Sequence, residues 1–390
     1  MITTERMARE ERFVGLYLHI PFCAAKCRYC DFHSAAAPRG VRERYVAALA
    51  GELFHRAPLA RGLTVDTVYI GGGTPTVLPP DEIARLLDTV REHYTLDPTA
   101  EVTVECNPHS FTEGMFERLR SAGVNRLSIG LQSALDCELS ALGRPHDAAA
   151  FAQTFCAARH AGFQNINVDI MLGIPHQTEK TLAHTLKTVI ELAPEHISAY
   201  GLRIEEGTPF FEERHTLPIA DEDTVADMQL LVASTLKEAG FEHYEVSNYA
   251  RAGYRSRHNM RYWLGSPYLG FGAAAHSYFG GVRYEVPRDT AGYIEAVERG
   301  DFSALIKEQH RITPHEEREE YVMLRMRLFE GIDEADFKAR FGIGFEQAYG
   351  DQQHLRRAGL LVREGGRIAF TERGMYVSNA ILSEWLDFGE

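Results

Sequence analysis

The stretch His19-Ile-Pro-Phe-Cys-Ala-Ala-Lys-Cys-Arg-Tyr-Cys-Asp-Phe32 places Cys23, Cys27 and Cys30 in one short loop after an apolar run. Structural zinc sites normally use four nitrogen or sulfur ligands, and no fourth cysteine follows in this loop. Three thiolates can instead hold a [4Fe–4S] cluster and leave one iron free for a non-protein ligand. A disulfide loop is the less favoured alternative, because the number of cysteines in the loop is odd.

The composition is that of an ordinary globular protein, with 390 residues, 45% of them hydrophobic and 25% charged. This length is sufficient for one large barrel-type domain and a smaller second one. The net charge of −14 argues against nonspecific binding to nucleic acids or anionic membranes, which attract basic surfaces. We therefore expect no nucleic-acid partner.

Membrane and secretory signals are not evident in the sequence. No apolar run approaches the roughly 20 residues that span a bilayer, and the polar residues 1–12 lack the apolar centre of a signal peptide. Cys106, Cys137 and Cys156 are scattered and are expected to be reduced. We expect no membrane span and a cytoplasmic location, where a reducing environment also suits an oxygen-sensitive cluster.

From Leu16 to about residue 240, short apolar runs alternate with amphipathic stretches. The expected strands are Leu16–His19, Thr67–Ile70, Glu101–Glu105, Arg126–Gly130, Asn165–Leu172 and His196–Tyr200. The expected helices are Arg42–Arg56, Asp81–His93, Thr112–Ala122, Ala148–Ala161, Thr178–Leu192 and Glu222–Ala239. Six such repeats predict a parallel sheet with right-handed crossovers. Periodicity alone leaves open whether this sheet curves into a barrel or is doubly wound.

The remainder of the chain divides into two further regions, so that we expect domains at 1–240, 241–310 and 311–390. The middle region is rich in Gly, Tyr and Asn up to about Phe302, which predicts strands and loops beside the barrel. The last region is expected to contain helices and a hairpin that turns at Gly365-Gly366; the helices are Pro314–Phe329, Asp333–Phe341 and Phe345–Ala358. This pattern predicts a winged-helix-like α+β domain, and the acidic balance favours a packing or docking role over DNA binding.

The cysteine spacing, with Tyr29 just before the third cysteine, resembles the signature of the radical S-adenosylmethionine (SAM) superfamily. The resemblance implies an α/β fold with a partial (β/α)6 barrel whose chemistry lies at the carboxyl ends of the strands, as in barrels generally. It also implies that Cys23, Cys27 and Cys30 hold a [4Fe–4S] cluster. In that superfamily the open iron binds the amino and carboxylate groups of SAM.

A glycine turn, Gly71-Gly-Gly-Thr-Pro75, follows the second expected strand and lets the backbone approach a ligand closely. The resemblance assigns Gly72, Gly73 and Thr74 to the amino group of SAM. Carboxylates can accept hydrogen bonds from ribose hydroxyls or an ammonium group, and arginine can pair with a carboxylate. By the same resemblance, the other expected SAM residues are Tyr17, Glu105, Gln132, Arg144 and Asp169.

Two features of the sequence indicate the branch of the superfamily. Oxygen-independent coproporphyrinogen III dehydrogenases have a fourth cysteine where this chain has Phe32, and a longer segment before the cluster loop. The cysteine loop together with His258-Asn-Met-Arg-Tyr-Trp263 instead resembles the heme chaperone branch. A neutral imidazole is a good axial ligand of heme iron, so His258 is the candidate heme ligand, with His276 a weaker one. Arg257 or Arg261 could meet a heme propionate.

The resemblance therefore implies heme, SAM and a [4Fe–4S] cluster as cofactors, and a protein that passes heme to an acceptor, for example one of a respiratory chain. Heme transfer, rather than porphyrin decarboxylation, is the expected principal function. Three alternatives stay open at this point. They are a coproporphyrinogen III dehydrogenase, a radical SAM methyltransferase or cyclopropane-forming enzyme, and a regulator that acts through the winged helix.

Overall fold

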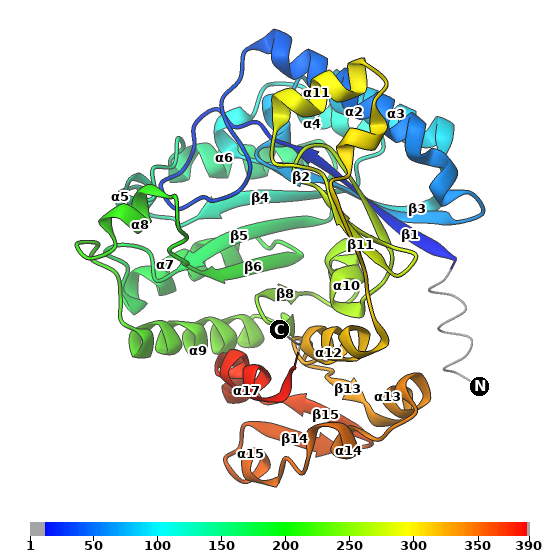
Figure 1. The fold of residues 1–390 in the computed structure, drawn as a ribbon. Coiled ribbons are helices and arrows are strands. Elements are labelled where there is room, and N and C mark those ends of the chain that lie inside the picture. The colour runs from blue at the N-terminus through cyan, green and yellow to red at the C-terminus, as the bar shows by residue number, and fades with distance from the viewer. Residues whose placement is uncertain (1–11, 388–390) are drawn as a thin grey trace.

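Six parallel strands form the centre of the fold in the computed structural model, which describes residues 12–387 (Figure 1). They are β1 (Phe13–Ile20), β2 (Thr64–Gly72), β3 (Thr95–Cys106), β4 (Arg126–Gln132), β5 (Ile166–Leu172) and β6 (His196–Gly201). The strands lie side by side in chain order. A doubly wound sheet would reverse its order at a switch point. The consecutive order therefore confirms the expected partial (β/α)6 barrel.

Helices connect these strands and cover the outer face of the curved sheet (Figure 1). Several begin at a side-chain cap that satisfies a free backbone N–H: Asp147, Thr178 and Asp221 cap α6, α7 and α9. The helices of this half are α2 (Arg39–Arg56), α3 (Pro80–His93), α4 (Met115–Ser121), α5 (Asp136–Ala141), α6 (Ala148–His160), α7 (Glu179–Glu191), α8 (Pro209–Glu213) and α9 (Glu222–Glu238). Short 3₁₀ helices lie at Ala57–Ala60, Pro75–Val77, Pro108–Ser110 and Phe302–Leu305.

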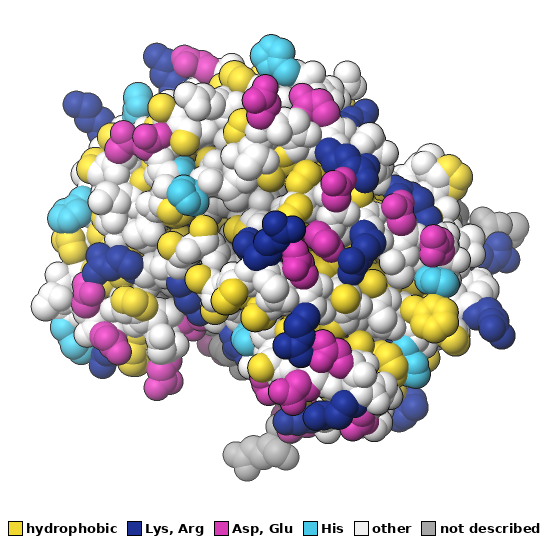
Figure 2. All heavy atoms as spheres, turned by 90° about the horizontal axis from the view of Figure 1, so that it is seen from above, with side chains coloured by type: hydrophobic (Ala, Val, Ile, Leu, Met, Phe, Trp, Pro, Cys, Tyr) yellow, Lys and Arg dark blue, Asp and Glu magenta, His cyan; other side chains and the backbone are white. Residues whose placement is uncertain are grey.

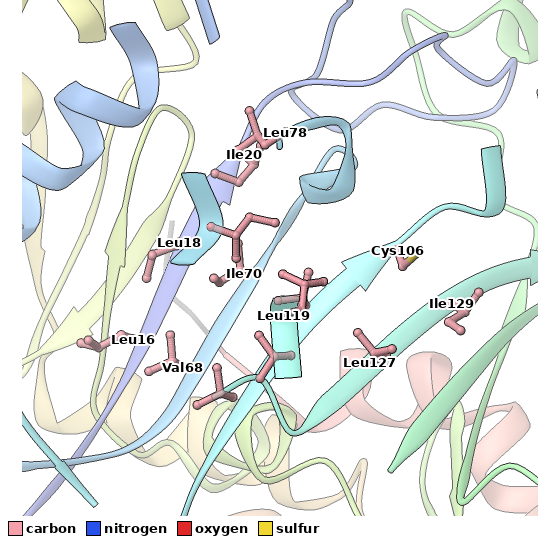
Figure 3. Close-up of a cluster of buried hydrophobic side chains, with 14 of the residues drawn as sticks. Leu16, Leu18, Ile20, Val68, Ile70, Leu78, Cys106, Leu119, Leu127 and Ile129 are labelled. Atoms are coloured by element: carbon pink, nitrogen blue, oxygen red, sulfur yellow. The ribbon is translucent and has the colours of Figure 1, made fainter. Parts of the chain in front are cut away.

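Alternate residues of each strand serve opposite faces of the sheet. Leu16, Leu18 and Ile20 of β1 pack with Val68 and Ile70 of β2 in the main hydrophobic core between sheet and helices (Figure 3). The intervening positions carry polar side chains toward the inside of the barrel. The register places Glu105 beside Ser128 and Asp169 beside Ser198 on this inner face. The fold thereby lines the interior with groups that can bind a polar ligand.

Six additional strands extend the sheet at both ends, as expected. Next to β1 lie β9 (Tyr268–Phe271), parallel to it, and then the antiparallel β10 (His276–Phe279), β11 (Val282–Glu285) and β12 (Glu308–Arg311). Next to β6 lie β8 (Asn248–Ala250) and β7 (Glu242–Glu245), both in antiparallel pairs.

The same region also contains two helices where we expected only strands and loops. They are α10 (Arg257–Leu264) and α11 (Thr290–Glu298). Ser256 caps α10, and Gly265 ends it with a φ of 63°. Both helices are short, and α10 is rich in polar residues, so neither gives a long apolar period. The residues that cap these helices predict them better than apolar periodicity does.

The C-terminal region forms a second hydrophobic core, to which Phe337, Phe345 and Phe370 contribute. The expected hairpin is present and turns at Gly365 and Gly366, both with positive φ. The expected helix 345–358 is instead two short helices, because Gly350 adopts a φ of 77° that breaks the run. The elements are α12 (Pro314–Arg325), β13 (Ile332–Asp333), α13 (Glu334–Phe341), α14 (Phe345–Tyr349), α15 (Gln353–Arg357), β14 (Leu361–Glu364), β15 (Arg367–Phe370), α16 (Glu372–Tyr376) and α17 (Ser378–Trp385).

Backbone hydrogen bonds join the C-terminal region to the end of the barrel sheet. Val246 N donates to Arg327 O at 3.1 Å, and Phe329 N donates to Tyr244 O at 3.2 Å. The segment after α12 thus runs along β7 and continues the sheet hydrogen bonding.

Basic and acidic side chains are intermixed on the face shown in Figure 2, where Lys and Arg lie next to Asp and Glu. Such mixing gives this face no single large basic patch of the kind that attracts nucleic acid. In the part of the chain that the structure describes, no helix is both long enough and apolar enough to cross a membrane.

Candidate functional site

A cavity of about 1090 Å³ opens at the carboxyl ends of the barrel strands. Its lining contains the three cysteines of the cluster loop and every predicted SAM residue except Tyr17. Residues from six different strand ends and connecting loops are therefore brought to one place. The predicted residues in the lining are Cys23, Cys27, Cys30, Gly72, Gly73, Thr74, Glu105, Gln132, Arg144 and Asp169.

The cluster loop, residues 21–38, is held in place by backbone bonds at both sides. Cys23 N donates to Ala35 O at 3.1 Å, which closes the loop on itself, and Arg28 N donates to Leu142 O at 3.1 Å. All three cysteines are free thiols. Cys23 Sγ lies 3.6 Å from Thr74 Oγ1, and Arg144 Nη1 lies 3.6 Å from Cys27 Sγ. A hydroxyl and a guanidinium therefore contact the sulfur atoms from the barrel side.

The three thiols of this loop fit a [4Fe–4S] cluster, which can take three cysteine ligands and keep one iron open. Among residues 12–387, no three His, Cys, Asp or Glu side chains converge as the ligands of one metal ion. Burial raises the pKa of the Cys30 thiol, and the nearby Cys27 and Cys23 raise it further. A bound metal would reverse this effect by favouring the thiolate.

The glycine turn packs directly beneath the cluster loop. Gly73 N donates to Ile20 O at 2.9 Å, and Thr74 N donates to Phe22 O at 2.7 Å. A Cβ atom at Gly73 would lie only 2.6 Å from Phe22 O, so no side chain fits there. Gly72 has a φ of 112°, which other residues rarely adopt. The glycines are therefore required by close backbone contact.

Glu105 is the buried carboxylate at the end of β3. Its Oε1 accepts from Tyr69 OH at 2.8 Å, and its Oε2 accepts from Gly72 N at 3.0 Å. Burial raises its pKa to about 7, despite these two donors. A carboxylate at this position can accept further hydrogen bonds from a ligand in the cavity, because each oxygen has two lone pairs.

Asp169 lies on the neighbouring inner face and is held by amide and hydroxyl donors. Asn167 Nδ2 donates to Oδ1 at 2.7 Å, and Ser128 Oγ donates to Oδ2 at 3.2 Å. Burial also raises the pKa of Asp169. Arg126 lies nearby, lines the same cavity, and favours the ionised forms of Asp169 and Glu105. The sequence prediction missed Arg126, because an arginine at the start of an apolar run resembles a surface residue.

Gln132 and Arg144 meet above Gly130 at the end of β4. Arg144 Nη2 donates to Gly130 O at 2.9 Å. A Cβ atom at Gly130 would lie 2.9 Å from Gln132 Nε2 and 3.0 Å from Arg144 Nη2, so both side chains depend on this glycine. Gln132 itself has a φ of 72°. Gly130 was not predicted, although a glycine inside a strand is a known sign of close approach.

Tyr17 and His258 belong to a cluster of aromatic side chains around Tyr69, which itself lines the cavity. Tyr17 OH lies 3.0 Å from His19 Nδ1, and its ring stacks on Tyr69 with 6.2 Å between centroids. Neither Tyr17 nor His258 lines the cavity, although Asn259 of α10 does. The structure therefore does not place these two predicted residues with the others.

Both ring nitrogens of His258 have hydrogen-bond partners. Nδ1 lies 2.9 Å from Thr67 Oγ1, and Nε2 lies 2.8 Å from Tyr262 OH. The side chain is buried, and this burial lowers its pKa to about 3, so the imidazole is neutral. The weaker candidate, His276, is exposed and lies 3.4 Å from Glu285.

Comparison with known proteins matches residues 17–189 to the radical SAM superfamily and residues 312–377 to the HemN C-terminal domain. The heme chaperone HemW of Bacillus subtilis is 32% identical over 376 residues, which cover 95% of this chain and 98% of that protein. The chain belongs to the HemW family. HemW of Mycobacterium tuberculosis is 35% identical over 94% of this chain and 93% of its own. HemW of Escherichia coli is 34% identical over 96% of this chain and 98% of its own.

The fold of this HemW-family chain is also that of a solved radical SAM enzyme. Coproporphyrinogen III oxidase (HemN) from Escherichia coli superposes with a TM-score of 0.84 at 23% identity, and the match covers 100% of this chain and 93% of that one. The likeness confirms the barrel and its C-terminal addition. Membership of the radical SAM superfamily implies a [4Fe–4S] cluster and SAM, and the cavity residues of the HemW-family chain fit both.

Proposed function

We propose that this protein is a heme chaperone that binds heme and passes it to an acceptor protein. The observation that carries the proposal is its identity of 32–35% to three proteins named heme chaperone HemW, over nearly the full length of each chain. Both motifs that suggested this branch, the cysteine loop and His258-Asn-Met-Arg-Tyr-Trp263, are intact. Phe32 occupies the place of the fourth cysteine expected in the related dehydrogenases, which supports chaperone over dehydrogenase activity.

The cavity residues support distinct roles in holding the cofactors. Cys23, Cys27 and Cys30 would hold the [4Fe–4S] cluster, which when bound supplies a one-electron donor and a coordination site for SAM. Gly72, Gly73 and Thr74 would present backbone and hydroxyl groups to the SAM amino group. The carboxylates would accept hydrogen bonds from the ligand's polar hydrogens, and the Arg144 guanidinium would pair with the SAM carboxylate. Gln132, Glu105 and Asp169 complete the proposed SAM set within the cavity, and Tyr17 is proposed with them from behind Tyr69, a lining residue on which it stacks.

We infer that the cofactors act by ordering the mouth of the barrel. The cluster loop and the glycine turn already exchange backbone hydrogen bonds, at Gly73 and Thr74. A ligand that bridges them would hold both in one conformation and shape the surface that meets heme or the acceptor. The acceptor proposed is a heme protein, such as one of a respiratory chain, and the proposed location is the cytoplasm.

We still propose His258 as a heme ligand, on the condition that its hydrogen bond to Tyr262 is first broken. A neutral imidazole can bind iron, and the low pKa of His258 keeps it neutral at physiological pH. Its Nε2 must first exchange the Tyr262 hydroxyl for the metal. Ligation therefore requires that the segment around α10 open.

Heme titration and transfer assays test the proposed function. Anaerobically reconstituted protein should bind heme, with a change in the heme absorption spectrum, and should transfer it to an apo-acceptor. A variant with Cys23, Cys27 and Cys30 all changed to Ala should transfer heme more slowly or bind the acceptor more weakly. Equal transfer by this variant would remove the role of the cluster. Efficient formation of protoporphyrinogen from coproporphyrinogen III, with reductant and SAM, would favour the dehydrogenase instead.

A further inference from the structure

The cavity extends from the cofactor residues toward the C-terminal region. Its volume of about 1090 Å³ slightly exceeds the roughly 300–1,000 Å³ of usual small-molecule sites. This second part is bounded by the end of β6, by α9 and by α16 and α17, and Figure 1 shows α17 below α9. The cavity therefore extends beyond the residues assigned to SAM.

Arg203 and Arg327 line this second part of the cavity. Arg203 follows the end of β6, where Leu202 N donates to Leu172 O at 2.8 Å and fixes the backbone. Within residues 12–387, the Arg203 guanidinium makes no hydrogen bond or ion pair. Its five N–H groups are thus available to a ligand.

Arg327 has only neutral partners among the described residues. Nη1 donates to Ser378 Oγ at 3.0 Å, and Nη2 donates to Asn379 Oδ1 at 2.5 Å. These contacts with α17 fix the guanidinium and leave its remaining N–H groups free. Burial and the positive charge of Arg203 both hold the pKa of Arg327 below its ordinary value. Two like charges therefore lie close enough to repel each other.

The acidic residues of the cavity do not neutralise the positive charges of Arg203 and Arg327. None of them forms an ion pair with Arg203 or Arg327 in the described part of the chain. They are Asp31, Glu105, Asp169, Glu205 and Glu222. An arrangement of two adjacent cations without an anion is stabilised when an anionic ligand binds.

Apolar and aromatic side chains form the walls next to the two arginines. Val225 and Val232 of α9 face the cavity from one side, with Tyr249 and Met375 also in its lining. The Tyr376 hydroxyl is buried and has no hydrogen-bond partner among residues 12–387. The site thus combines apolar walls, a pair of cations and an unpaired hydroxyl. A flat apolar molecule with two carboxylates has this combination of properties.

We propose that Arg203 and Arg327 bind the two propionate groups of the heme, which lies between α9 and the C-terminal region. This inference rests on the proposed function, because it assumes that heme is the cargo. The arginines of the His258 motif are engaged elsewhere: Arg261 pairs with Asp66, and Arg257 Nη1 donates to Thr99 O at 2.7 Å. Asn259, the neighbour of His258 in α10, lines the same cavity as Arg203 and Arg327.

A titration of full-length, reconstituted protein with heme and with heme dimethyl ester tests this proposal. Arg203→Gln is the main variant, because Arg203 supports no other described residue. It should weaken heme binding roughly tenfold to a hundredfold, the range for a charge-assisted hydrogen bond. The ester has no carboxylates and should bind wild type and variant equally. Arg327→Gln should repeat the result, with thermal unfolding measured to detect any loosening of α17.

Arg299→Gln is the matched control, because Arg299 is an exposed arginine whose side chain pairs, within residues 12–387, only with Glu295 four residues earlier. Heme binding by this control should equal that of wild type. Equal heme affinity of wild type and Arg203→Gln would overturn the inference and leave the proposed function standing. A loss that affects the ester as much as heme would also overturn it. Failure of the wild type to bind heme would instead refute the proposed function.

Discussion

The two ends of the barrel place similar polar groups in different surroundings. At the mouth, Cys23, Arg144 and Asp169 border a large cavity and can still contact a ligand. At the base, His258 is enclosed, and Thr67 and Tyr262 occupy both of its ring nitrogens. The comparison shows that residue type alone does not define a binding site. Replacements at the mouth should mainly impair ligand binding, whereas replacements at the base should mainly reduce stability.

Tyr69 joins the two ends. Its hydroxyl donates to Glu105 at 2.8 Å, and its ring stacks on His258 with 5.2 Å between centroids. Glu105 in turn accepts from Gly72 N in the glycine turn. A change at the base can therefore reach the mouth through this short chain of contacts, and the predictions below separate its two ends.

Removal of a cluster ligand should give the largest effect. Cys27→Ala should abolish the iron–sulfur absorption and nearly all bound iron, because two thiolates cannot hold the cluster securely. Urea unfolding of the cluster-free wild type and the cluster-free variant should differ little, because the Cys27 thiol forms no disulfide. Cys156→Ala is the control, since Cys156 is an exposed thiol away from the cavity. Full iron content in Cys27→Ala would contradict the assigned cluster loop.

His258→Ala should reduce the stability of the fold rather than the binding of the cluster. Loss of a buried side chain and of two hydrogen bonds should lower the free energy of unfolding by about 3–4 kcal/mol. Urea unfolding measures this change, with Asn259→Ala of the same helix as a control. Asn259 lines the cavity and is less buried. A decrease of less than about 1 kcal/mol in the free energy of unfolding would show that His258 and its hydrogen bonds do not hold the base together.

Glu105→Gln should reveal a pH dependence of stability that arises from Glu105, the residue that Tyr69 links to His258. The folded pKa of about 7 lies above the ordinary 4.5, so the folded state retains a proton that the unfolded state loses. Below about pH 4.5 this carboxyl is protonated in both the folded and the unfolded state, so its titration does not change the free energy of unfolding. Stability of wild type relative to Glu105→Gln should then fall as pH rises from about 4.5 to 7, by at most about 3 kcal/mol. A pH-independent difference in urea unfolding would contradict the raised pKa.

Tyr262→Phe should give the smallest change. It leaves His258 Nε2 without its partner and should reduce stability by about 1–2 kcal/mol. Tyr268→Phe is the control, because the Tyr268 hydroxyl makes no hydrogen bond with another residue in the range 12–387. Tighter heme binding by Tyr262→Phe would support His258 as the iron ligand, since its nitrogen would be free. Unchanged stability would show that the bond to Tyr262 contributes little.

The sequence predicted the parts of the structure that depend on local pattern. The run predicted as Asn165–Leu172 is β5, Ile166–Leu172, because apolar residues alternate with Asn167 and Asp169, as in a strand with one apolar and one polar face. The cysteine spacing and the glycine turn likewise identified residues that line one cavity. Family resemblance supplied Glu105 and Asp169, whose types alone would have suited any surface.

The features that the sequence did not predict depend on contacts between distant segments. Arg126 is buried because β4 is central in the sheet, and its neighbours come from β3 and β5. Arg203 and Arg327 meet only because the C-terminal region packs against the end of the barrel. His258 was expected near a ligand, but the cap at Ser256 and the contacts of α10 enclose it. No local periodicity could have shown these placements.

The open barrel leaves a sheet with two ends, and each end is protected from pairing with another molecule. At one end, the segment after α12 covers β7 through the bonds of Val246 and Phe329. At the other, β12 is short and its four residues, Glu308–Arg311, are all exposed and polar or charged. Exposed, flat apolar edges promote aggregation, whereas covered or charged ones resist it. Loss of the C-terminal region should therefore uncover a strand edge and make the remaining barrel prone to self-association.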